Sequence, residues 1–396
     1  MTTIESPTIK NSHTVAPDGL VARTFLSFLA TAGLFYANIM PAIVDGLIQA
    51  LGFTPQDAGF VGSANVYGAA VGALLIVFLI KRLRWRTTAY VLIGALISMD
   101  LLSMLVTSPQ PLIAMRFVHG VVGGALVGTA FSVIARTVSP DRTFGVLLVV
   151  QFGLGGLGNM YLPRLVPMFG VDVLFMALIA FSVVTALMIP LLDEYRVQPP
   201  TAAQLNSKTE KIRVVPLALA LISVFLFQAG NMGLFAFVIG LGRAYALELD
   251  FITLTLAASA WVGIVGAVAV VVLHTRFGRL RPLVIAMLLT TVGILALHYS
   301  ANATLFFIAN CGMGITWAFI IPYLLGLCAE FDKSGQMAAL GGFASKMGLA
   351  SGPLVAGLLL GDDNYGLLIN ISAVVLFVSM LACIVPAIYQ DKAVAN

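Results

Sequence analysis

The sequence predicts an all-α integral membrane protein with twelve transmembrane helices, arranged as two six-helix halves related by pseudo-two-fold symmetry. Three observations lead to this fold class: the composition, the spacing of apolar segments and a repeat between the halves. Of 396 residues, 60% are hydrophobic and 10% are charged, whereas a soluble domain carries about 25% charged residues. Mean hydropathy is +1.03. Such a chain cannot cover a soluble core with polar surface, so a bilayer is its natural solvent.

The apolar segments have the length that a membrane requires. A spanning helix needs about 20 mostly apolar residues, and the longest polar interruption, residues 193–215, lies between the sixth and seventh such segments. We therefore expect an N-terminal half (1–192), a cytoplasmic linker (193–215) and a C-terminal half (216–396). In order, the twelve segments cover about 22–49, 58–80, 87–107, 110–135, 144–168, 171–191, 214–241, 252–274, 282–299, 303–329, 337–361 and 366–389.

Basic residues indicate how the chain is oriented. Of the 21 Lys and Arg, 17 fall on one face of this topology, Arg164 and Arg243 fall on the other, and Arg116 and Lys346 lie inside spans. Because loops rich in Lys and Arg stay in the cytoplasm, we expect a multi-pass protein of the cytoplasmic (inner) membrane with both termini cytoplasmic. The net charge of +4 then reflects orientation and not nucleic-acid binding. The polar N-terminus has no signal-peptide pattern.

The two halves match each other at a shift of 194 positions. Val71-Gly72-Ala73 recurs as Val265-Gly266-Ala267, and the same shift relates Arg82 to Arg276, Gly120 to Gly314 and Gly158 to Gly352. One shift that serves several spans indicates a duplicated six-helix unit.

Polar residues inside the spans are candidates for the functional site, since polar groups avoid lipid and face the bundle interior or a water-filled cavity. Their spacing, judged by helical periodicity, puts several of them on shared faces. The candidate substrate-binding residues are Arg116, Lys346, Asn38, Gln151, Gln228, Asn231, Asn310 and Trp317.

Arg116 is the most unusual of these residues. A buried guanidinium stays protonated and needs a partner, and Asp45 and Asp100 lie at a similar depth, within about 10 Å of the outer ends of their spans. The hypothesis is that Asp45 or Asp100 exchanges a proton, while Arg116 partners it or holds an anionic substrate. His119, on the same face as Arg116, titrates near neutral pH. Structural alternatives remain: an Arg116–Asp100 link between helices, a solvated Asp45 at a helix end, and a His119 bonded to a backbone carbonyl.

Two motifs resemble a known family. The stretch "HTRFGRLR" contains the R-F-G-R pattern of Arg276 to Arg279, "LIKRLRWR" keeps Arg82, and Arg116 with Gly120 gives R-x-x-x-G. With twelve spans and a basic central linker, they resemble the major facilitator superfamily. The resemblance implies a secondary transporter that works by alternating access, with a conformational switch at Arg82, Arg276, Gly278 and Arg279. The acid usual in this loop is absent, because Lys81 and Thr275 stand in its place.

The expected function is transport of a small organic anion, coupled to protons. Lys346 lies about 14 Å into its span with no acid at that depth in the C-terminal half. Arg116 in the first half and Lys346 in the second are expected to hold the anion between the halves. The alternative is a proton-antiporting efflux pump for drugs or other lipophilic compounds, since the proline-containing first span resembles that branch of the family. A channel would need more pore-lining polar residues. No catalytic constellation, cofactor motif or metal-ligand spacing is present, and the three cysteines suggest none. The expected partners are the substrate, protons and lipid, with the protein working as a monomer.

Overall fold

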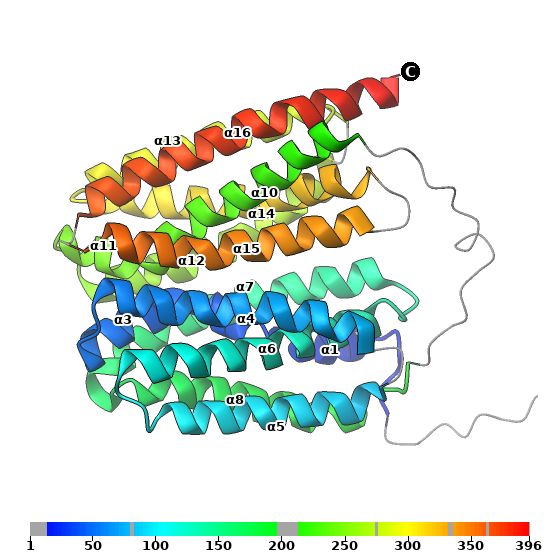
Figure 1. The fold of residues 1–396 in the computed structure, drawn as a ribbon, viewed down its shortest axis with the longest axis vertical. Helices are drawn as coiled ribbons and strands as arrows, with labels where there is room; N and C mark the ends of the chain where they lie inside the picture. Colours follow the sequence, from blue (N-terminus) through cyan, green and yellow to red (C-terminus); the bar gives the residue numbers. More distant parts are fainter. Residues whose placement is uncertain are drawn as a thin grey trace, which may run out of the picture.

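The computed structural model describes residues 14–79, 83–195, 213–273, 276–331, 336–361 and 364–395. Within these ranges the chain is helical, and apart from an isolated bridge between Arg276 and Gly278 it has no β pairing. The long helices run side by side along one common direction (Figure 1). The predicted all-α fold is confirmed for the described part of the chain.

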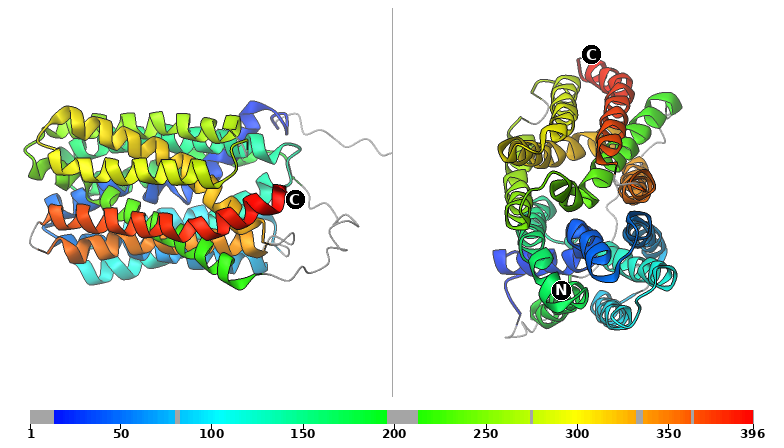
Figure 2. Two further views of the ribbon diagram at one scale, coloured as in Figure 1. Left: turned by 90° about the horizontal axis from the view of Figure 1, so that it is seen from above. Right: turned by 90° about the vertical axis from the view of Figure 1, so that its left-hand side faces the viewer.

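The helices before the linker gather on one side of the molecule, and those after it gather on the other (Figures 1 and 2). We call them the first and second groups. The first group contains α1 (Leu20–Ala32), α2 (Phe35–Asn38), α3 (Met40–Leu51), α4 (Pro55–Leu79), α5 (Trp85–Ser103), α6 (Pro109–Ile134), α7 (Pro140–Phe169), α8 (Asp172–Met188) and the 3-10 helix η1 (Ile189–Leu191). The second group contains α10 (Val214–Ala236), α11 (Val238–Ala244), α12 (Leu249–Leu273), α13 (Leu280–Ala296), η2 (Leu297–Tyr299), α14 (Ala303–Ala329), α15 (Gln336–Leu359) and α16 (Tyr365–Ala395).

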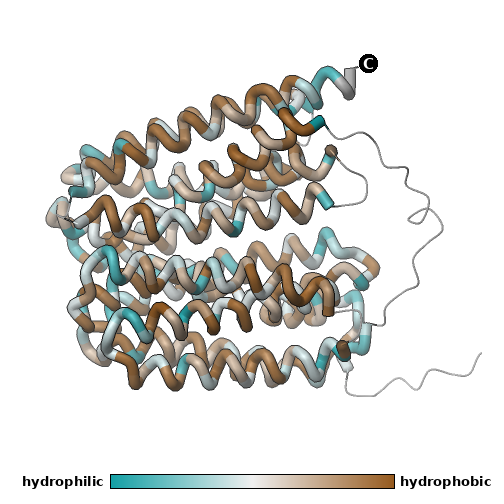
Figure 3. Tube along the Cα trace, viewed as in Figure 1, coloured by the Kyte–Doolittle hydropathy of each residue, from teal (hydrophilic) through white to brown (hydrophobic). Residues whose placement is uncertain are grey.

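The chain is a multi-pass membrane protein. Nine helices of the described ranges are long and apolar enough to cross a bilayer, and apolar residues dominate the helices in Figure 3. The first predicted span is divided into α1, α2 and α3, of which α1 and α3 are shorter apolar helices. Helices α5 and α15, at the third and eleventh predicted spans, are not among the nine. The count of twelve spans therefore stays a prediction.

Helix ends follow local sequence signals. Pro55, Pro109 and Pro140 each stand at the first position of a long helix, where the missing N–H of proline costs no hydrogen bond. The side chain of Asn302 accepts hydrogen bonds from the backbone N–H groups of the first turn of α14, as an N-cap residue does. Gly52 closes α3 with a φ of 68°, a conformation that favours glycine.

Glycines bring pairs of helices into close contact in both groups. A Cβ at Gly72 would collide with the carbonyl oxygen of Val121, and a Cβ at Gly266 would collide with that of Ile315. These two contacts, α4 on α6 and α12 on α14, are related by the 194-residue shift. Small residues allow such backbone approach in membrane helices.

A second contact recurs at the same shift and includes side chains. Gly120 lies against the carbonyl of Asn65, and Gly314 lies against that of Ser259. The amide of Asn65 donates to the carbonyl oxygen of Arg116 at 3.3 Å, and the hydroxyl of Ser259 donates to that of Asn310 at 2.7 Å. The helix packing is therefore repeated at these positions. The residue whose carbonyl accepts the hydrogen bond is an arginine in the first group and an asparagine in the second.

The apolar core shows where the two groups meet. We call the end where α8 and η1 finish and α10 begins the linker end, and the other the opposite end (Figure 1). The larger core cluster joins the second group to the opposite-end part of the first, including Ile39, Phe175, Phe237 and Phe306. At the linker end the first group has a separate cluster built on α1, α5, α6 and α8. The groups are therefore closed against each other at the opposite end.

Candidate functional site

The first predicted span is interrupted near the middle of the bundle. Helix α1 ends at Ala32, and α3 begins at Met40 with Pro41 in its first turn. Proline lacks the N–H that a continuous helix would use. The side chain of Asn159 on α7 donates to the carbonyl oxygen of Asn38 at 2.9 Å, which satisfies a carbonyl beside the break. Asn38 and Asn159 therefore connect the interruption to α7.

The seventh predicted span is interrupted as well, at Phe237 between α10 and α11. Just before this break, Asn231 donates through its side chain to the carbonyl oxygen of Phe227 at 2.9 Å. Discontinuous helices at corresponding positions of two repeats mark the binding region in many transporters. The two breaks therefore direct attention to the space between α1–α3 and α10–α11.

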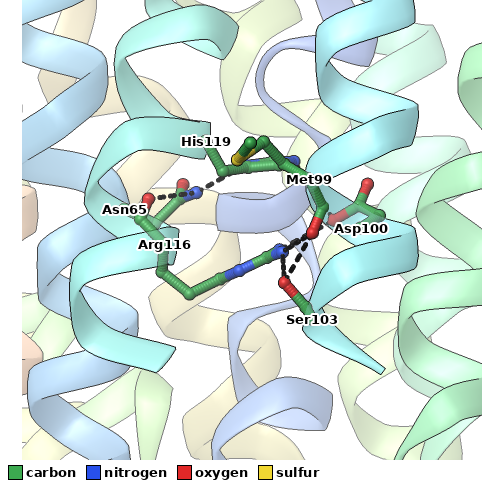
Figure 4. Close-up of polar contacts among 6 residues, drawn as sticks. All are labelled: Asn65, Met99, Asp100, Ser103, Arg116 and His119. Carbon is green, nitrogen blue, oxygen red and sulfur yellow. Dashed lines mark hydrogen bonds and ion pairs between the residues drawn. The ribbon is translucent and has the colours of Figure 1, made fainter. Parts of the chain in front are cut away.

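Arg116 lies in a buried charge cluster inside the first group (Figure 4). Its Nη1 donates to Asp100 Oδ1 on α5 at 2.7 Å, and its Nη2 donates to Met99 O at 3.1 Å and to the hydroxyl of Ser103. The Arg116 side chain is completely buried, and that of Asp100 is 1% exposed. Arg116 thus joins α6 to α5, and Asp100 is the acid that neutralises it.

His119 is the third titratable member of this cluster. Its Nε2 lies 3.3 Å from Asp100 Oδ1, and its Nδ1 lies 2.7 Å from the amide nitrogen of Asn65. The same amide nitrogen also faces the carbonyl oxygen of Arg116, which can only accept. Asn65 therefore donates to Nδ1, and His119 keeps its proton on Nε2, from which it donates to Asp100.

One oxygen of the cluster has no protein partner. Within the described part of the chain, Asp100 Oδ2 is buried and makes no hydrogen bond, although Oδ1 accepts from both Arg116 and His119. The hydroxyl of Tyr36, whose ring lies 5.9 Å from that of His119, is also buried without a partner among these residues. Asp100 Oδ2 and the Tyr36 hydroxyl are therefore the oxygens of this cluster that the described residues leave unsatisfied.

The centre of the second group holds a different polar set. The indole N–H of Trp317 on α14 donates to Gln228 Oε1 at 2.9 Å, and Gln228 Nε2 donates to the hydroxyl of Ser345 on α15 at 2.8 Å. Lys346 follows Ser345. It is only partly buried, and no hydrogen bond or ion pair of its ammonium group with another described residue is found. Gln228 and Trp317 are thus connected to Ser345, the residue before Lys346.

The face of α15 that carries Lys346 is turned toward the first group. Pro353 and Gly357, seven and eleven residues further along, lie on the same helical face. Both contact the start of α4, at Gly59 and Pro55 respectively. Lys346 therefore projects toward the first group, about two turns nearer to the linker end than these contacts.

Asp45 does not partner Arg116, although its depth in the sequence allowed that pairing. It lies in α3, 6% exposed, and its Oδ2 accepts from Nη2 of Arg243 on α11 at 3.0 Å. The broken first span turns Asp45 toward the second group, whereas Arg116 points to α5. Depth along a helix says nothing about which neighbour a residue faces.

The Asp45–Arg243 ion pair lines a cavity at the opposite end. The cavity measures about 360 Å³ and lies between α3, α11 and the start of α4. A second ion pair joins the groups nearby: Arg164 Nε on α7 lies 3.1 Å from Asp250 Oδ1 and 2.7 Å from the hydroxyl of Thr253 on α12. Arg164 and Arg243, which the sequence places on the face opposite the 17 basic residues, therefore both bridge the two groups.

Contacts between the groups extend into the middle of the bundle. The hydroxyls of Tyr67 and Ser351 lie 2.7 Å apart. The indole N–H of Trp261 donates to the carbonyl of Gly153 at 3.3 Å. Among the described residues, the cross-group polar contacts thus lie in the middle and at the opposite end.

The expected switch loop has acids that the motif did not reveal. Arg279 donates through its backbone N–H to Asp391 at 2.8 Å and forms an ion pair with Glu330. Gly278, with a φ of 69°, leaves no room for a Cβ beside Asp391. Burial lowers the pKa of Arg279, and the charge of Asp391 opposes this shift. Arg276 bridges to Gly278, whereas Arg82 lies outside the described residues.

The remaining candidates are less central. Asn310 is 4% exposed and donates to the carbonyl of Phe306 inside the second group. Gln151 is partly buried on α7, one turn before Gly155, which lies against Asn38. Asn65, Ser103 and the Arg164–Asp250 pair were not predicted. The one sequence signal for Arg164 and Arg243 is that they are the two basic residues on the face opposite the cytoplasmic loops.

Comparisons with known proteins agree with this architecture. A family model described as Major Facilitator Superfamily matches residues 24–331. Among solved structures, the chain is similar to a mutant of the nucleoside transporter NupG, with a TM-score of 0.66, 15% identity and coverage of 95% of this chain and 99% of that one. At this identity the likeness shows the fold alone. No curated protein matches the chain.

Proposed function

Because this chain belongs to the major facilitator superfamily, and is thus a transporter and not an enzyme, we propose that it moves a small organic anion by alternating access. In this proposal twelve spans form two six-helix halves that rock about a central site. The linker end faces the cytoplasm, as the 17 basic residues of that face suggest. The protein works as a monomer in the cytoplasmic membrane.

The observation that carries the proposal is Lys346. A lysine this far from either end of a span is energetically costly, and charged residues at such positions usually mark a functional site. It faces the other half, and in the described ranges it has no acidic partner. Arg116 is already neutralised by Asp100. A substrate anion is therefore assigned to Lys346, with Gln228, Asn231, Gln151 and Asn38 as polar neighbours of the site.

The test is ligand binding to purified protein, measured by thermal stabilisation with a panel of small carboxylates and lipophilic cations. Carboxylates should stabilise the wild type, and Lys346→Gln should weaken that binding at least about tenfold, since a charge-assisted hydrogen bond contributes about 1.5–3 kcal/mol. Lys346→Arg, which keeps the charge, should retain most of it. Stabilisation by cations alone, unchanged in Lys346→Gln, would contradict an anion carrier.

Proton coupling is assigned to the cluster of Asp100 and His119. Asp100 Oδ2, which has no hydrogen-bond partner in the described part of the chain, supports this role. Uptake into proteoliposomes should lose its dependence on a pH gradient in Asp100→Asn and in His119→Gln, which retains an amide donor in place of the ring N–H. Uptake that stays proton-dependent in Asp100→Asn and in His119→Gln would refute this assignment. If Asp45→Asn also left it proton-dependent, coupling through all three predicted residues would be refuted.

Efflux of lipophilic compounds by proton exchange is the second candidate. The observation that favours it is Asp45, a buried acid in the wall of a cavity whose lining is largely apolar. An efflux pump should bind lipophilic cations, and Asp45→Asn should abolish that binding while Lys346→Gln preserves it. Because the fold is similar to that of the nucleoside transporter NupG, the ligand panel should also include nucleosides, as uncharged compounds.

A further inference from the structure

Trp317 is held in one orientation in the middle of α14. Its indole N–H donates to Gln228, whose amide nitrogen donates to Ser345. Gln228 is 2% exposed, so rotation of the indole would leave a buried amide oxygen without a donor, which is unfavourable. The indole itself is only partly buried. A rigid, partly accessible aromatic face therefore lies beside the helix that carries Lys346.

A ring from the first group already lies against this indole. Phe152 on α7 lies with its ring centroid 6.0 Å from that of Trp317, at an interplanar angle of 89°. The pair joins the two groups, so a movement that separates α7 from α14 would break it. The surface of Trp317 that Phe152 covers would then be free for another flat ring, and aromatic pairs gain stability beyond that of their buried area.

We propose that the transported anion carries an aromatic or other flat ring, which packs against Trp317 where Phe152 lies in this conformation, while its acidic group binds Lys346. This inference rests on the proposed function, because it takes Lys346 as the anion-binding cation. One side chain, Gln228, connects Trp317 to Ser345, the residue before Lys346. Trp317 and Lys346 therefore lie on the neighbouring helices α14 and α15, where one substrate molecule can contact both.

The test compares two ligands of equal charge and carbon number. Benzoate has a flat aromatic ring, and cyclohexanecarboxylate has a puckered one without π electrons. Isothermal titration calorimetry on the full-length protein in detergent should give about tenfold tighter binding of benzoate, the upper range expected for one aromatic pair. In Trp317→Leu the two affinities should become equal, and in Trp317→Phe most of the preference should remain.

Trp261→Leu is the matched control. Trp261 also contacts the other group, through Gly153, but it belongs to a different helix, α12, and should leave the preference unchanged. Equal binding of the two carboxylates to the wild type would overturn this inference and leave the anion carrier standing. Loss of the preference in Trp261→Leu as well would also overturn it. Absence of binding of either carboxylate, or binding unaffected by Lys346→Gln, would overturn the proposed function itself.

Discussion

At the scale of single residues, Arg116 shows how an apolar bundle tolerates a charge. Its guanidinium is fully buried, and its ion pair, carbonyl and hydroxyl contacts all come from α5. Removal of one partner from such a pair costs more than removal of both, because a buried charge is left uncompensated. The cluster is therefore sensitive to substitution of Asp100.

Asp100→Asn should destabilise the protein by about 3 kcal/mol or more. Thermal unfolding of the purified variant in detergent measures this effect. Asp141→Asn is the control, since Asp141 is an exposed acid in the first turn of α7 and should cost less than about 1 kcal/mol. The double variant Asp100→Leu/Arg116→Met should recover much of the loss. An Asp100→Asn variant as stable as Asp141→Asn would contradict a structural role for the pair.

The sequence predicted part of this cluster for a physical reason. Depth along the helix axis follows from residue counting, so Asp100 could be identified as a possible partner of Arg116. Orientation about the axis depends on which helices are neighbours, and the sequence does not reveal this. For that reason the contribution of Asn65 from α4, and the pairing of Asp45 with Arg243, became visible only in the structure.

At the scale of helices, glycine contacts fix α4 on α6 and α12 on α14. Here the sequence was more informative, because a contact that leaves no space for a Cβ requires glycine in both copies of a duplicated unit. The shift that relates Gly72 to Gly266 predicted equivalent packing, and the contacts of these two glycines agree at that shift. The interruption of the first span was not predicted, although the sequence shows that this span contains a proline.

Gly72→Ala and Gly266→Ala should each destabilise the protein by about 1–3 kcal/mol, because the added methyl group forces two helix backbones apart. Gly94→Ala provides the matched control: a Cβ there meets nothing within 4 Å, and alanine favours a helix by about 1 kcal/mol over glycine. Denaturation curves of the three variants measure the difference. Equal stability of Gly72→Ala and Gly94→Ala would rule out tight α4–α6 packing in the membrane.

At the scale of the whole molecule, two ion pairs close the opposite end. Asp45–Arg243 and Arg164–Asp250 both join the two groups, whereas the first group has its own core cluster at the linker end. Since the Arg243 side chain is 33% exposed, solvent screens its pair, which contributes about 1 kcal/mol at most. The pairs therefore favour the closed opposite end only moderately, as a reversible closure requires.

Arg243→Gln should shift the population toward opening at the opposite end by up to about fivefold, the effect of 1 kcal/mol. Spin labels at Thr107 and Ala301, exposed positions of the two groups at that end, should report a larger fraction of long distances in cysteine-free protein. Arg142→Gln, at an exposed linker-end position of α7, should leave the distribution unchanged. An identical distribution in both variants would refute a closing role for Arg243.

The charge of Lys346, which has no partner among the described residues, also gives the molecule an electrical response. A full elementary charge that crosses a membrane gains or loses about 2.3 kcal/mol per 100 mV, and Lys346 lies well within the span. With a monovalent anion bound, the site is neutral and the field acts little on it. In the empty carrier the lysine charge stands alone, so on the proposed orientation an inside-negative potential favours the state whose site opens to the cytoplasm. On the proposed mechanism, the return of the empty carrier is then voltage-dependent through Lys346, whereas substrate movement is voltage-dependent only through the proton that accompanies it.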